Sequence, residues 1–254
     1  MTSIVVPSRA APIAGAHGSP AAAIAARRER VFFSSLAVLL LVTVFGGFAR
    51  TYYLNGFVSA PFALTPALHW HGAAFTAWML LLVTQTSLVA TGRAHLHRRL
   101  GVVGAVLALA MIGLGGHVAI SRTAGGTIAD HGAPPLLFLA VPLVGMVVFA
   151  ALVGSALYLR HHPAAHKRLM MLATLELVTA GVSRLPIVDS WGPVGFFAVT
   201  DLFLLAMIVY DWRALGRVHT ATLLGGAFLI ASQPLRLILG ATGIWTAFAT
   251  WLVA

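Results

Sequence analysis

The chain has 254 residues, of which 59% are hydrophobic and 9% charged, and its mean hydropathy is +0.94. A soluble domain of this length carries about 25% charged residues, so the composition excludes a soluble globular protein and makes the lipid bilayer the solvent. The net charge of +10 comes from short basic clusters between apolar runs. This pattern is typical of membrane topology signals and excludes nucleic acid as a partner. The absence of cysteine excludes disulfides, thiolate metal sites and iron–sulfur clusters.

The N-terminal segment over residues 1–30 is predicted to be a disordered basic arm. Its first 26 residues are rich in Ala, Pro, Ser and Gly, and the basic cluster Arg27-Arg28-Glu29-Arg30 then precedes the first apolar run. That run is longer than the apolar core of a signal peptide and lacks a small-x-small cleavage site. We therefore expect an uncleaved first span.

Residues 31–254 predict an all-α integral membrane domain, a bundle of seven transmembrane helices. A helix needs about 20 apolar residues to cross the hydrocarbon core of a bilayer. Seven such runs occur, at about 31–53, 66–91, 100–121, 134–159, 168–187, 193–212 and 219–240. The apolar tail over 241–254 either extends the last helix or lies in the membrane interface.

The distribution of basic residues predicts the orientation of the bundle. The N-terminal arm and the second, fourth and sixth connections are rich in Arg, whereas the first, third and fifth connections have almost none. Because basic loops stay in the cytoplasm, we expect the N-terminus inside and the C-terminus outside, with the basic loops binding anionic lipid head groups. The Arg- and Ala-rich composition favours a bacterial inner (plasma) membrane.

Once the direction of each span across the membrane is assigned, the position of a residue in its span gives its depth, because a helix rises about 1.5 Å per residue. Charged side chains inside a membrane tend to face the bundle interior and to mark a working site. On this scale five residues lie near one level of the outer leaflet, namely Arg50, His71, His117, Arg184 and Arg236. Glu176 and Asp201 lie below them, near the middle of the membrane.

The depth of His71 and His117 favours a b-type haem. These residues lie on sequential antiparallel spans, so their imidazoles could be the two axial ligands, with Arg50, Arg184 and Arg236 pairing the propionates. Alternatively, His69 and His131, with Asp130, could complete a metal site from the outer face. The structural interpretation is that each histidine bonds a backbone carbonyl or lies at the interface.

Two interpretations are open for the buried acids and bases, which are Glu176, Asp201, Arg184 and Arg236. They could form structural ion pairs between helices, or a proton or substrate site of a carrier.

From the histidine pair, the chain is expected to be a haem-binding electron-transfer or respiratory-assembly protein. The alternatives are a proton-coupled carrier or small-molecule binding protein, and a structural or assembly subunit. No Walker, Rossmann or hydrolase motif occurs, so the sequence leaves open whether the chain is an enzyme.

Six histidines cluster with arginine at the predicted cytoplasmic rim: His95, His97, His161, His162, His166 and His219. We expect them to be solvated, because basic residues at this level set topology and meet lipid head groups. An inner haem held by His97 and His166 is a minor alternative.

Two of these clusters begin neighbouring spans alike, with His97-Arg98-Arg99-Leu100-Gly101 and His166-Lys167-Arg168-Leu169-Met170. With Arg184 later in the fifth span and His69 and His71 early in the second, they resemble uncharacterised bacterial multi-pass membrane families. Helices in those families begin with His-Arg-x-Leu-Gly and His-Lys/Arg-x-x-Met patterns. The resemblance covers roughly residues 66–187 and implies a bacterial membrane fold, but no catalytic residue.

Overall fold

The computed structural model describes residues 19–58, 63–127 and 133–254, which form helices and short connections without a strand. The elements are α1 (Pro20–Phe48), the π-helical turn η1 (Ala49–Tyr53), α2 (Pro66–Ala90), α3 (Ala94–Ala124), α4 (Pro135–Phe138), α5 (Ala140–Tyr158), α6 (Pro163–Val182), α7 (Pro186–Asp189), α8 (Gly192–Leu215), α9 (Thr220–Gly240) and α10 (Gly243–Val253). The predicted all-helical class is confirmed.

Six of the described helices are long and apolar enough to cross a membrane, and the chain is a multi-pass membrane protein. They are α1 with η1, α2, α3, α4 with α5, α8 and α9. Helix α6, in the place of the fifth predicted span, is not among the six because it carries Lys167, Arg168 and Glu176. It is instead the central helix, buried along most of its length and packed against α1, α5, α8 and α9.

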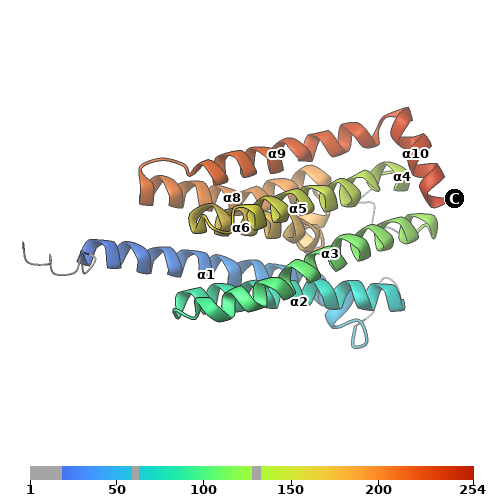
Figure 1. The fold of residues 1–254 in the computed structure, drawn as a ribbon. Coiled ribbons are helices and arrows are strands. Elements are labelled where there is room, and N and C mark those ends of the chain that lie inside the picture. Colours follow the sequence, from blue (N-terminus) through green and yellow to red (C-terminus); the bar gives the residue numbers. More distant parts are fainter. Residues whose placement is uncertain (1–18, 59–62, 128–132) are drawn as a thin grey trace, which may run out of the picture.

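The long helices run side by side, so the bundle has two distinct ends (Figure 1). At one end α1 begins and the connections 91–93, 159–162 and 216–219 turn the chain around. We call this the basic end, after the Arg and His residues of those connections. The opposite end, which we call the cavity end, contains η1, the segment 183–191 and α10.

Helix starts follow from local sequence. Pro lies in the first turn of α1, α2, α6 and α8, where its missing N–H removes no helical hydrogen bond. The side chains of Ser19, Thr65 and Thr242 accept hydrogen bonds from the first turns of α1, α2 and α10. These residues fix where each helix begins, and hence the level at which its polar side chains lie.

The first helix begins earlier than the sequence predicts, and this corrects the disordered arm expected over 1–30. α1 begins at Pro20, because Ser19 caps it and the Ala-rich segment over 21–26 has high helix propensity. Residues 1–18 lie outside the described part of the chain. The C-terminal tail is also resolved: it forms the separate helix α10, and the Trp245 indole donates to the Leu136 carbonyl at 2.7 Å.

A buried ion pair ties the helices together at the basic end. Arg168 of α6 and Asp211 of α8 are each 1% exposed, and the Arg168 Nε donates to Asp211 at 3.0 Å. Asp211 also accepts from the Thr222 hydroxyl at 2.6 Å and from the His219 amide at 3.2 Å. Arg168 is therefore not one of the solvated basic residues that the sequence predicts at this level.

At the cavity end α1 and α6 cross in backbone contact. A Cβ atom added at Gly47 would lie 2.0 Å from the Gly181 carbonyl oxygen, and one added at Gly181 would lie 3.1 Å from the Val44 Cα. Small residues at such crossings let membrane helices approach closely. This crossing places η1, which directly follows α1, beside the C-terminal part of α6.

We therefore predict that Gly47→Ala destabilises the protein by about 2 kcal/mol or more, since the added methyl group meets rigid backbone. Thermal unfolding in detergent measures the change. Gly46→Ala is the matched control, because a Cβ atom at Gly46 meets nothing within 4 Å. That variant should be neutral or stabilising. Equal unfolding temperatures for the two variants would contradict the described crossing.

Candidate functional site

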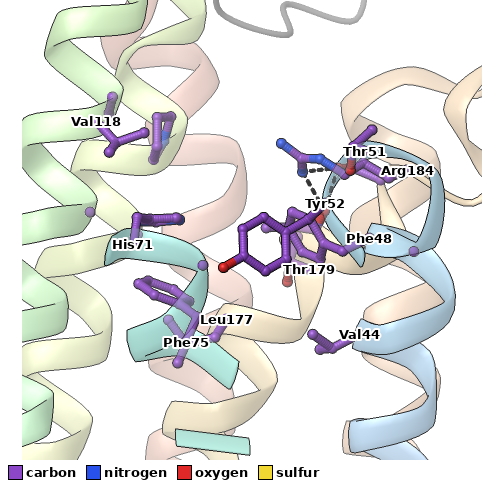
Figure 2. A pocket seen from close by; sticks show the side chains of 18 of the residues that line it. Val44, Phe48, Thr51, Tyr52, His71, Phe75, Val118, Leu177, Thr179 and Arg184 are labelled. Carbon is purple, nitrogen blue, oxygen red and sulfur yellow. Dashed lines mark hydrogen bonds between the residues drawn. The ribbon is translucent and has the colours of Figure 1, made fainter. Parts of the chain in front are cut away.

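A cavity of about 1090 Å³ opens between the helices at the cavity end. Residues that line it come from α1, η1, α2, α3, α4, α5, α6, α8 and α9 and from the segment after α6. Most of the lining is apolar, but six charged side chains also reach it: Arg50, Arg122, Glu176, Arg184, Asp189 and Arg236. Figure 2 shows Arg184 projecting from one wall toward the wall that carries His71, with Tyr52 between them.

The base of the site is a buried ion pair between α6 and α9. The Arg236 Nη1 and Nη2 atoms donate to the two oxygens of Glu176 at 2.7 and 2.8 Å. Arg236 is 1% and Glu176 7% exposed. Two parallel charge-assisted hydrogen bonds of this kind are among the strongest polar contacts in proteins. The pair joins two helices and presents a charged group to the cavity.

Three neighbouring residues hold this ion pair in place. The Ser232 hydroxyl accepts from Arg236 Nη2 at 2.7 Å, and the Ser232 carbonyl accepts from its Nε at 3.2 Å. The Arg236 guanidinium lies 5.4 Å from the centre of the Phe197 ring. A Cβ atom at Gly145 of α5 would lie 2.8 Å from Glu176 Oε1. Glycine at this position therefore leaves the space that the carboxylate occupies.

One wall of the cavity is the π-helical turn η1, from which Arg50, Thr51, Tyr52 and Tyr53 all line the cavity. The Tyr52 hydroxyl donates to the His69 carbonyl at 3.2 Å, and the Tyr53 hydroxyl shares a 2.8 Å hydrogen bond with Thr76. These two contacts join the turn to α2. π-helical turns are rare and occur frequently at functional sites.

Arg184 lies just beyond the end of α6 and lines the same cavity. Its Nη1 donates to the Ala180 carbonyl at 2.5 Å, and its guanidinium lies 4.5 Å from the centre of the Phe48 ring. Among the described residues no carboxylate lies within 4 Å of this guanidinium. A cation without a close carboxylate is expensive in a medium of low dielectric constant, which makes Arg184 a candidate for binding a ligand.

Two polar atoms on opposite walls have no hydrogen-bond partner among the described residues. They are the Thr51 hydroxyl and the His71 Nδ1 atom, both buried and both belonging to residues that line the cavity. The His71 ring stacks obliquely on Phe75, with centroids 4.2 Å apart. Buried polar groups are nearly always hydrogen-bonded, so these atoms are available to hydrogen-bond water or a ligand in the cavity.

The structure does not bring the other predicted residues to the cavity. Gly115, Val118, Ala119 and Arg122 form the stripe of α3 that lines it, so His117 lies on another side of the helix and is exposed. His69 is exposed as well; its backbone carbonyl and its ring contact Tyr52 of η1, with the ring centroids 6.1 Å apart, but it does not line the cavity.

Asp201 lies on α8, outside the cavity lining, and accepts a 2.8 Å hydrogen bond from Gln233 Nε2. It is therefore separated from Glu176, with which the sequence groups it. His131 and Asp130, predicted for a metal site, lie outside the described residues.

Two charged residues that the sequence does not single out, Arg122 and Asp189, also line the cavity. A detectable signal was the run Arg50-Thr51-Tyr52-Tyr53, four consecutive polar or aromatic residues at the end of an apolar span. Among the described lining residues four arginines face two carboxylates, an excess of positive charge.

No protein-family model, curated protein or solved structure matches the chain. The resemblance to bacterial multi-pass families therefore stays a prediction. The fold and its interior site define the class directly: a multi-pass helical membrane protein with a charged cavity near one end of the bundle.

We predict that Glu176→Gln destabilises the protein by about 3–5 kcal/mol, because it leaves the Arg236 charge buried without a counter-charge. The double variant Glu176→Gln, Arg236→Met should recover much of this loss, since no unpaired charge remains. Thermal unfolding of both variants in detergent tests the coupling. A double variant no more stable than the single one would show that the ion pair is not what couples α6 to α9.

Proposed function

We propose that the chain is a seven-span bacterial inner-membrane protein, with its N-terminus in the cytoplasm and its C-terminus outside. The proposal counts α6 as a span, because it has 20 residues and lies inside the bundle among the other long helices. The clustering of Arg at the basic end supports this orientation. The cavity then belongs to the outer half of the membrane.

Single cysteines test this topology, since the natural chain has none. Ser190→Cys lies in an exposed position at the cavity end and His161→Cys in an exposed position at the basic end. A membrane-impermeant maleimide should label the first variant in intact cells and the second only after permeabilisation. The reverse pattern would overturn the orientation, and labelling of both from outside would overturn the span count.

For the function itself, we propose that the cavity binds an anionic small molecule with an apolar body, as a binding protein or carrier does. The observation that carries this proposal is Arg184, a cation in the cavity wall without a carboxylate within 4 Å among the described residues. An anion bound there would pair the guanidinium in a medium of low dielectric constant, where charge-assisted hydrogen bonds are strong.

The remaining lining residues suit such a ligand. Arg50 supplies a second positive charge from η1, and Thr51 and His71 offer unpartnered hydrogen-bonding atoms. Phe75, Met79 and Val141 are among the apolar residues that would contact the body of the ligand. Glu176 is held by Arg236 and Asp201 lies outside the cavity, so binding requires no proton step from either acid.

A b-type haem with His71 and His117 as axial ligands is supported less well by this geometry. His71 lines the cavity, but His117 is exposed on another side of α3. An absorption spectrum of the purified protein distinguishes the two proposals: a Soret band that His71→Ala abolishes would favour haem over a colourless anion.

We predict that dodecyl phosphate, titrated by calorimetry into the protein in an uncharged detergent, binds at least ten-fold more weakly to Arg184→Gln than to the wild type. One lost charge-assisted hydrogen bond is worth about 1.5–3 kcal/mol. Arg160→Gln, which removes an exposed arginine at the basic end, is the control and should bind normally. Equal binding of dodecanol and dodecyl phosphate would reject an anion site.

A further inference from the structure

Two histidines at the basic end face one another from different helices. His97 lies in the first turn of α3 and His166 in the first turn of α6, and their ring centroids are 6.2 Å apart with the planes at 82°. Both residues are partly buried, in contrast to the exposed His161 and His162 nearby in the chain. They are therefore not the solvated topology signals that the sequence predicts.

The hydrogen bond of His166 determines which of its nitrogens is free. Its Nδ1 atom lies 2.8 Å from the Ala156 carbonyl oxygen, which can only accept a hydrogen bond. Nδ1 therefore carries the proton, and Nε2 of the neutral ring keeps its lone pair. A histidine whose second nitrogen donates to a backbone carbonyl has the outer-shell contact typical of metal ligands.

His97 contributes a second free nitrogen. Its Nδ1 atom is buried and has no hydrogen-bond partner among the described residues. The Gln85 Oε1 atom, another buried acceptor without a partner there, lies near the same end, since only residues 91–93 separate α2 from α3. Unpartnered buried acceptors are rare, and a cation satisfies them.

The ring separation fits one ion between the two imidazoles. Two rings on opposite sides of a common metal, at metal–nitrogen distances of about 2.0 Å, place their centroids about 6 Å apart. We propose that His97 and His166 bind a first-row transition-metal ion at the basic end, copper above all. Imidazole nitrogen suits Cu, Zn and Ni, and copper binds most tightly among the divalent ions. This site is separate from the cavity and does not depend on its proposed anion.

The test uses full-length protein that carries a purification tag without histidine, stripped of metal and titrated with Cu²⁺. We expect a single site whose electron paramagnetic resonance spectrum shows imidazole nitrogen couplings. His97→Gln and His166→Gln, which keep a polar side chain of similar size, should each weaken binding at least ten-fold. The unfolding temperature of each metal-free variant, compared with metal-free wild type, confirms that the fold is retained.

The matched control is the double variant His161→Ala, His162→Ala, which removes two exposed histidines of the same end. It should keep the Cu²⁺ affinity and spectrum of the wild type. Wild-type affinity in His97→Gln and His166→Gln, or loss of binding only in the control variant, would overturn the proposal. A wild type that retains no more Cu²⁺ than the double variant His97→Gln, His166→Gln would overturn it as well.

Discussion

The bidentate contact between Arg236 and Glu176 determines how the cavity end is built. It joins the central helix α6 to α9, and it requires glycine at position 145 because α5 must leave space for the carboxylate. A buried pair of this kind adds little net stability over apolar residues, but it is costly to break. It therefore fixes the relative positions of three helices, whereas Arg184 and Arg50 of the cavity wall have no carboxylate within 4 Å among the described residues.

Depth in the bundle could be predicted from sequence, whereas the direction of each side chain around its helix could not. The predicted levels bring five residues together, and these do line one cavity: Arg50, His71, Glu176, Arg184 and Arg236. His117 and Asp201 are at suitable levels but on other sides of their helices. In a span that is apolar all round, the sequence has no amphipathic stripe to indicate the inward side.

The basic end shows a different limit of sequence reasoning. Arg168 belongs to the same motif as the topology-setting residues, yet it is buried against Asp211. One feature of the sequence does indicate a buried partner for Arg168. Asp211 lies near the C-terminal end of α8, where its charge interacts unfavourably with the helix dipole and needs a cation beside it. Likewise, the contact between His97 and His166 depends on how α3, α5 and α6 pack, which local patterns do not encode.

The π-helical turn makes one wall of the cavity sensitive to chain length as well as to residue identity. Successive residues of an α-helix are about 100° apart around its axis, so four in a row spread over most of its circumference. The wider turn lets residues 50–53 all reach one cavity. Removing a single residue from 49–53 would restore α-helical spacing and turn part of this set away. Relatives that share the cavity should therefore keep the number of residues between the glycine crossing of α1 and the tyrosine pair.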